Sequence, residues 1–299
     1  MNQHPAQDSG LTHIPVMITE VLSYLAIQPD GIYLDGTIGP GGHAISVLKE
    51  LTDGGKVVGI DRDEEALDIC KQNLKTSSSF LSLHHNSYAN LDNIFAAEGL
   101  STAHGILLDL GLSSLQLGSK NRGFSYRSEG PLDMRFDQSN GSGAGKLIDQ
   151  AGRDSLAQIF KEYGEERLAS RIAKSIKEMT AMNTIADLRE AIRRCTPPNH
   201  RDRTFARIFQ ALRIAVNGEL DILQQFLAKF IDFLRPSGRI VIISYHSLED
   251  RLVKHSFKEL ASGGILDILT KRPITATEKE RKNNRRAGSA KLRAAVKVA

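Results

Sequence analysis

Short apolar runs alternate with amphipathic stretches over the first 110 residues. The runs at 31–35 (GIYLD) and 56–60 (KVVGI) contain few polar side chains, and 80–83 and 105–110 repeat the pattern. Between them, apolar residues recur about one helical turn apart. Continuous apolar strands separated by helices indicate a parallel sheet covered by helices on both faces. The sequence therefore predicts an α/β fold.

The alternation stops between residues 112 and 215. A Gly- and Ser-rich connector at 138–146 is followed by several helical stripes with no strand between them. The alternation then resumes with a predicted helix over 219–234 and a strand over 239–244. We therefore expect an all-helical insertion within a sheet-containing domain.

The predicted sheet domain is discontinuous and comprises residues 1–111 and 216–299, with the insertion at 112–215. Its last stretch, 271–299, holds ten basic and two acidic residues, a net charge of +8, although the whole chain carries only +4. A basic tail on a mildly acidic body is typical of a segment that contacts polyanions. A solvated, partly disordered tail is the alternative.

The amino-acid composition argues against a membrane protein and against a secreted, disulfide-bonded protein. Hydrophobic residues make up 40% of the chain, which is ordinary for a globular protein. No apolar run approaches the roughly 18 residues of a membrane span, and residues 1–10 lack the apolar core of a signal peptide. Two cysteines, Cys70 and Cys195, fit a reducing compartment. We expect a cytoplasmic protein without membrane contact, either a monomer or a homodimer.

The candidate chemistry lies where the predicted strands end, because ligands of open parallel sheets bind outside the carboxyl ends of the strands. Residues 35–43 (DGTIGPGGH) form a glycine-rich turn there. Residues 39–44 match the G-x-G-x-x-G/A pattern, and Asp61 lies 20 residues after Gly41, where a ribose-binding acid is expected. By itself, this loop fits a nicotinamide dinucleotide and S-adenosylmethionine equally well, or a plain strand-to-helix turn.

Three carboxylates favour S-adenosylmethionine. Asp35 ends the first strand, where it would attract the cofactor's cationic amino group and repel a diphosphate. Asp61 ends the second strand and can accept hydrogen bonds from both ribose hydroxyls. Asp109 ends the fourth strand, where a transferred group would meet its acceptor. The alternative is that each Asp caps the helix that follows it.

Methyl transfer requires alignment of the nucleophile and exclusion of water more than covalent help from the protein. The exocyclic amine of a base is a weak nucleophile, and an acceptor for its N–H would help to localise the lone pair. Asp109, Ser113 and Ser114 are the candidate catalytic residues, and the sequence does not choose among them.

Longer blocks carry a family resemblance. They lie at residues 13–17, 20–22, 35–43, 59–63, 106–114, 116–117, 122–125, 130–135, 209–214, 216–217, 243–251 and 289–293. With these blocks the chain resembles the RsmH (MraW) family, bacterial enzymes that methylate N4 of a cytosine in the decoding centre of 16S ribosomal RNA in the small ribosomal subunit. Residues 203–207 and 284–288 depart from the usual family pattern.

The resemblance implies a class I, Rossmann-like methyltransferase sheet with a helical insertion that binds the RNA substrate, and S-adenosylmethionine as the cofactor. The cofactor contacts that it implies, beside Asp35, are Gly41, Gly42, His43, Asp61, Tyr88, Asp109 and Gln116. No second His lies at helical spacing from His43, so we expect no metal. We expect His43 instead at a loop-to-helix hinge that offers backbone N–H groups to the methionine carboxylate.

Substrate contacts are predicted shortly after Asp109 and after the last strand. The candidates are Arg122, Phe124, Asp133, Arg135 and His246. Arginine beside an aromatic ring suits a base splayed out of its stack. The alternatives are a rim held by Asp133 and Arg135, and helix capping by Ser247 or Asp250 near His246. An NAD-dependent oxidoreductase and a non-catalytic RNA-binding ribosome assembly factor stay open as other functions.

Overall fold

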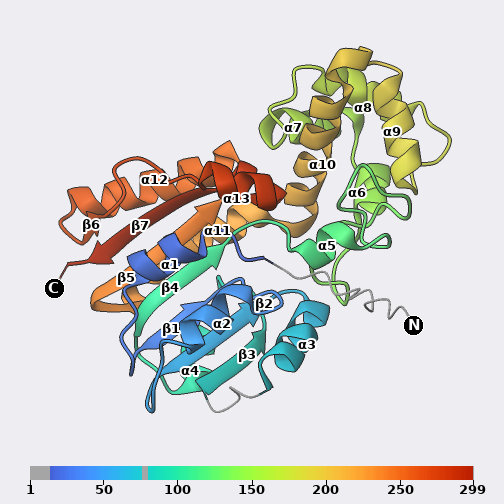
Figure 1. Cartoon of the computed structure of the whole chain (residues 1–299). Coiled ribbons are helices and arrows are strands. Elements are labelled where there is room, and N and C mark those ends of the chain that lie inside the picture. Colours follow the sequence, from blue (N-terminus) through green and yellow to red (C-terminus); the bar gives the residue numbers. More distant parts are fainter. Residues whose placement is uncertain (1–13, 76–79, 299) are drawn as a thin grey trace, which may run out of the picture.

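The computed structural model describes residues 14–75 and 80–298, so His13 and residues 1–10 lie outside the described part (Figure 1). The described residues form a seven-stranded sheet in the order β3-β2-β1-β4-β5-β7-β6. The strands are β1 (Ile32–Asp35), β2 (Lys56–Asp61), β3 (Leu81–His85), β4 (Ala103–Asp109), β5 (Leu234–Ser244), β6 (Leu266–Ile268) and β7 (Lys291–Lys297). Strands β1 to β5 are parallel, and β7 runs antiparallel to β5 and β6. The predicted α/β, Rossmann-like fold is confirmed.

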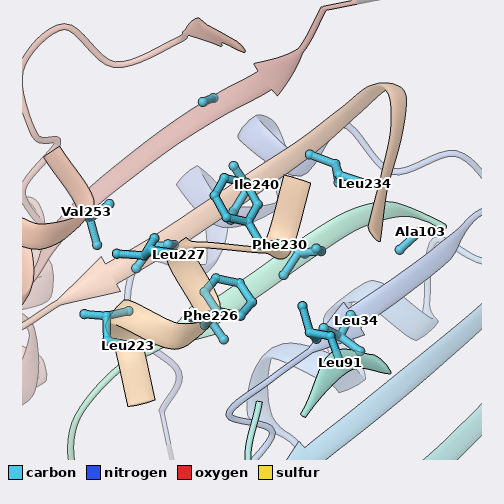
Figure 2. Close-up of a cluster of buried hydrophobic side chains, with 14 of the residues drawn as sticks. Leu34, Leu91, Ala103, Leu223, Phe226, Leu227, Phe230, Leu234, Ile240 and Val253 are labelled. Carbon is cyan, nitrogen blue, oxygen red and sulfur yellow. The ribbon is translucent and has the colours of Figure 1, made fainter. Parts of the chain in front are cut away.

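Helices cover both faces of the sheet because successive strand residues point to opposite sides. In β5, Ile240 and Ile242 pack against one face while Val241 and Ile243 pack against the other. The first face is covered by α4 (Leu91–Glu98), α11 (Glu219–Leu227) and α12 (Ser247–Ser262), whose apolar side chains Figure 2 shows around Phe226. The second face is covered by α1 (Ile18–Leu25), α2 (Gly42–Leu48) and α3 (Glu64–Asn73).

The segment between β4 and α11 contains the helices α5 (Ser114–Gly118), α6 (Ala144–Gln150), α7 (Arg153–Glu162), α8 (Ala169–Lys177), α9 (Ile185–Arg193) and α10 (Arg201–Asn217). Most of them gather beside the sheet around a hydrophobic core of their own (Figure 1). This core buries Phe160 and Ile208 completely. Gly218, with φ 60°, turns the chain from α10 into α11.

The element that follows α11 differs from the prediction. Helix α11 ends at Leu227, a short 3-10 turn follows at Phe230–Phe233, and β5 already begins at Leu234. Leu234 is buried and pairs with Ala103, after which the register shifts. Ser237 has φ 60° at the turn predicted for residues 236–238. The predicted turn therefore interrupts a strand instead of preceding it.

Residues 271–298 are built into the body of the protein, so the alternative of a disordered tail is wrong. Strand β7 lies between β5 and β6, and its Leu292, Ala294 and Ala295 are buried. Arg293 pairs with Asp250 at 2.7 Å. Lys291 also pairs with Asp250, and Lys297 Nζ donates to the carbonyls of Ile231 and Leu234. In the part of the chain that the structure describes, no helix is both long and apolar enough to cross a membrane.

Candidate active site

A cavity of about 880 Å³, its open mouth included, lies at the carboxyl ends of the central strands. Its walls come from the loops after β1 and β4, the starts of α11 and α12, and the segment before β7. Seven of the predicted catalytic and cofactor residues line it, namely Gly42, His43, Asp61, Tyr88, Asp109, Ser113 and Gln116. Asp35, which is buried, and Gly41 are not among the lining residues, and Ser114 is the first residue of α5.

The glycine loop is tied to three neighbouring strand ends. The Gly39 N–H donates to Asp61 Oδ2 at 2.8 Å, and the Thr37 N–H donates to Asp35 Oδ1 at 3.1 Å. The hydroxyl of Thr37 accepts the Asp109 N–H at 2.6 Å. A Cβ on Gly36 would lie 2.4 Å from Leu108 Cδ2 and 2.9 Å from Tyr88 Cβ, so this position requires glycine. The three predicted carboxylates are thus brought to one edge of the sheet.

Two of these carboxylates have raised pKa values. Burial raises the pKa of Asp35 to about 8, and the negative charges of Asp109 and Asp61 add to the effect. Burial also raises the pKa of Asp61 to about 6, against hydrogen bonds from the Asp63 and Gly39 N–H groups. A cation beside them would favour their charged forms. The chemistry of this edge therefore suits a positively charged ligand.

Asp109 is held from several sides. Its Oδ1 accepts a hydrogen bond from the Tyr245 hydroxyl at 2.6 Å, and its Oδ2 lies 3.5 Å from Arg286 Nη2. His43 Nε2 donates to the Val16 carbonyl at 2.9 Å, which leaves Nδ1 facing Asp109 Oδ2 at 3.8 Å. The hydrogen bond from Tyr245 and the ion pair with Arg286 hold the carboxylate at the wall of the cavity.

Arg122 joins the helical segment to the sheet and does not line the cavity. It is 3% exposed, and its Nη2 donates to Asp63 Oδ2 at 2.8 Å and to the carbonyl of Phe136 at 2.9 Å. Gln116 Nε2 also donates to Asp63 Oδ2, at 2.8 Å. The predicted substrate contact by Arg122 finds no support in this position, because the guanidinium is buried in a structural ion pair.

The other predicted substrate residues of 122–135 are also placed away from the cavity. Phe124 is buried in the core of the helical segment and stacks on Phe136 at 5.6 Å. Asp133 and Arg135 form an ion pair at 2.8 Å, and Arg135 also donates to loop carbonyls. The alternative of a rim network is therefore the arrangement found. Phe136, the next residue along the chain, lines the cavity in their place.

His246 caps α12, so the expectation that Ser247 or Asp250 provides the cap is wrong. The Glu249 N–H donates to His246 Nδ1 at 3.4 Å, and Glu249 Oε2 accepts the N–H groups of Tyr245 and His246 at 2.8 and 3.2 Å. Ser247 instead donates to Glu165. Asp250 pairs with basic residues of β7.

Sequence reasoning missed several residues of the cavity wall. They are Arg62, Phe136, Glu219, Ile222, Leu223 and Arg286 on the wall itself, with Tyr245 hydrogen-bonded to Asp109. Tyr245 belongs to a block already noted at 243–251. Glu219 and Arg286 come from segments whose approach to the cavity depends on tertiary structure, so no local pattern marks them.

Comparison with known proteins places the chain in a family. The model of the MraW methylase family matches residues 10–298. The ribosomal RNA small subunit methyltransferase H of Halothermothrix orenii is 43% identical, over 96% of this chain and 99% of the relative. The protein of the same name from Kosmotoga olearia is 44% identical, over 96% and 98%. That from Sorangium cellulosum is 42% identical, over 98% and 93%.

The comparison with solved structures finds an rRNA methylase from Streptococcus thermophilus. It has a TM-score of 0.46 and 13% sequence identity, and the match covers 96% of this chain and 99% of that one. The family match spans both the sheet and the helical segment, and the identity to relatives extends over nearly the whole length. The chain therefore belongs to the MraW methylase family.

Proposed function

We propose that this protein transfers the methyl group of S-adenosylmethionine to N4 of a cytosine in the decoding centre of 16S ribosomal RNA, in the cytoplasm. The observation that carries the proposal is one cavity lined by the glycine loop, Asp61 and Asp109 in a chain of the MraW methylase family. The relatives named above carry ribosomal RNA small subunit methyltransferase in their names.

The residues present fit the cofactor. When bound, S-adenosylmethionine supplies an electrophilic methyl group on a sulfonium. Asp61 lines the cavity beside Gly39, where its carboxylate would accept the ribose hydroxyls. Gly42 and His43 begin α2, and their N–H groups would face the methionine carboxylate. Asp35, buried beneath the loop, would add negative charge below the amino group.

The acceptor side lies at the ends of β4 and β5. Asp109 and Ser113 line the cavity there, and the apolar side chains of Leu110, Phe136 and Ile222, which also line it, would limit the access of water when the ligands are bound. Asp109, fixed by Tyr245, would face the amine of the base and favour a localised lone pair. These residues orient the reactants, which is the main contribution that methyl transfer needs from a protein.

The distribution of charge supports an RNA substrate. Residues 112–215 hold 18 basic and 12 acidic side chains, a net charge of +6, and 271–299 add +8, which leaves −10 for the other residues. Both positive segments reach the cavity, through Phe136 and Arg286 respectively. RNA phosphates would be attracted to these segments, and the affinity should fall with salt.

Mass spectrometry of small-subunit RNA from cells with and without the gene tests the proposal. We expect one cytosine to lack its N4 methyl group when the gene is absent. An unchanged modification pattern would favour a non-catalytic assembly factor. Calorimetry with S-adenosylhomocysteine and with NAD distinguishes the methyltransferase from an oxidoreductase. Tight binding of NAD would be required of the oxidoreductase.

A further inference from the structure

Two glutamates of the cavity wall, Glu219 and Glu249, gather with His246, which is not itself among the lining residues. Glu219 begins α11, whereas His246 and Glu249 belong to the start of α12. One carboxylate oxygen from each Glu and one ring nitrogen of His246 lie within 4.8 Å of one another. Both carboxylates line the cavity although their side chains are only 9% and 3% exposed. We call these residues the Glu219–His246–Glu249 cluster.

The two carboxylates are rigidly held but keep acceptor capacity. Glu249 Oε2 accepts the N–H groups of Tyr245 and His246, which leaves Oε1 without a backbone partner. Both oxygens of Glu219 accept hydrogen bonds from Arg213, at 2.8 and 2.9 Å. Each carboxylate oxygen has two lone pairs, so Glu219 can still accept another donor.

A buried donor in the cluster lacks a well-directed partner. His246 Nδ1 accepts the Glu249 N–H, so the ring proton resides on Nε2. Nε2 lies 3.1 Å from Glu249 Oε1 but outside hydrogen-bonding geometry, and the side chain is 8% exposed. A buried N–H group without an acceptor lowers the stability of the folded protein. A bound ligand that accepts this hydrogen bond would remove the cost.

The arrangement suits an amine better than a metal ion. A proton on His246 Nε2 leaves no lone pair for a cation, and Arg213 on Glu219 would repel one. A planar amine that donates two N–H bonds of about 2.9 Å, roughly 120° apart, needs acceptors about 5 Å apart. A carboxylate oxygen of Glu219 and one of Glu249 lie within 4.8 Å of each other, close enough for both to approach a single amine group.

We propose that Glu219 and Glu249 accept the two N4 hydrogens of the target cytosine, while His246 Nε2–H donates to the adjacent ring nitrogen N3. This inference rests on the proposed function and assigns the site that reads the base. Uracil presents a carbonyl and an N–H at these positions, so the same cluster would reject it. A site built to hydrogen-bond one pattern discriminates strongly against the reversed one.

The cluster also provides an acceptor for the proton that the amine loses after methylation. As the N4 lone pair forms the bond to the methyl carbon, the S–CH₃ bond breaks and its electron pair stays on sulfur. The methylated amine is then cationic, and one of its protons passes to a carboxylate and on to solvent. Burial raises the pKa of Glu219, against the lowering effect of Arg213, so Glu219 is the more basic of the two carboxylates. For Glu249, burial raises the pKa, but contact with His246 and the charge of Arg213 outweigh it and keep the pKa below its ordinary value.

Glu249→Gln is the sharpest test, because the amide oxygen can keep the backbone hydrogen bonds of the cap while the acceptor facing the cavity is lost. Asp187→Asn is the matched control, since Asp187 occupies the same capping-box position in α9, outside the cavity. The readouts are single-turnover methyl transfer to small subunits from cells lacking the gene, the half-saturating subunit concentration, and S-adenosylhomocysteine affinity by calorimetry.

We expect Glu249→Gln to slow transfer about 10- to 100-fold, with cofactor affinity and half-saturation within about threefold of wild type, and Asp187→Asn to match wild type. Transfer at the wild-type rate, or a parallel loss of cofactor affinity, overturns the inference. Binding of Mn²⁺ by the wild type that Glu249→Gln abolishes also overturns it, in favour of a metal site. Failure of the wild type to transfer the methyl group overturns the proposed function itself. Slow transfer by Glu249→Gln beside normal transfer by the wild type supports both the proposed function and this inference.

Discussion

The hydroxyl of Tyr245 donates a 2.6 Å hydrogen bond to Asp109. The two residues follow neighbouring strands, because β4 and β5 pair in parallel with Asp109 opposite Ile243. Tyr245 also stacks against the guanidinium of Arg286, which lies 5.6 Å from the ring centre. One aromatic side chain therefore connects the end of β4, the end of β5 and the segment before β7 at the wall of the cavity.

Removal of this hydroxyl should slow methyl transfer. Tyr245→Phe keeps the ring and its stacking but leaves Asp109 free to turn, so we expect a transition-state cost of about 1–2 kcal/mol, or roughly 5- to 30-fold in the single-turnover rate. Tyr24→Phe, which removes a hydroxyl outside the cavity, is the control. Equal rates for the two variants would mean that the orientation of Asp109 does not matter.

Loss of the Asp61 carboxylate should weaken cofactor binding. Asp61→Ala removes the expected acceptor of the ribose hydroxyls and the partner of the Gly39 N–H. We expect a loss of about 1.5–3 kcal/mol in S-adenosylhomocysteine affinity by calorimetry, the range for a charge-assisted hydrogen bond. Asp68→Ala, on the exposed side of α3, should bind normally. Unchanged affinity in Asp61→Ala would show that this carboxylate faces something other than the ribose.

The raised pKa of Asp35 predicts how stability depends on pH. Its pKa of about 8 in the folded protein exceeds the ordinary 3.8, so the folded state binds more protons between these values. The free energy of unfolding should therefore fall as pH rises from about 4 to about 8, by at most about 1.4 kcal/mol per pH unit from this group. Asp35→Asn, which cannot titrate, should lose that part of the slope. Urea unfolding at pH 5, 6.5 and 8 measures it, and parallel profiles for both proteins would refute the prediction.

The buried ion pair of Arg122 predicts a structural phenotype. Arg122→Ala leaves Asp63 buried without its cation and releases two backbone carbonyls, so the free energy of unfolding should drop by about 3–5 kcal/mol. Arg127→Ala, at an exposed position beside Tyr126, should cost less than about 1 kcal/mol. If Arg122→Ala instead unfolded like the wild type and lost only RNA affinity, the guanidinium would be a substrate contact after all.

The sequence predicts the sheet well because its strands are buried on both faces and read as continuous apolar runs. Strand β7 escaped prediction since Lys291, Arg293 and Lys297 alternate with its apolar residues, and its partners lie far away along the chain. The start of β5 at Leu234 was hidden by a turn that interrupts the strand.

The cofactor side of the site was easier to predict than the acceptor side. Glycines and carboxylates at strand ends are local signals, so Asp61 and Asp109 could be placed on the cavity wall from their positions alone. Arginines and aromatic residues give no comparable local signal, because the same residue types serve in packing and in substrate binding. Arg122 and Phe124 serve the packing of the helical segment, whereas Glu219 and Arg286 reach the cavity through contacts that no spacing reveals.

The most direct test of the central claim uses the purified protein, small subunits from cells lacking the gene, and S-adenosylmethionine that carries a deuterated methyl group. Digestion of the RNA and mass spectrometry then locate the label. We expect one labelled nucleoside, a cytidine with the deuterated methyl on N4, within the decoding centre. Label on a ring carbon, a ribose or another base, or no label at all, would contradict it.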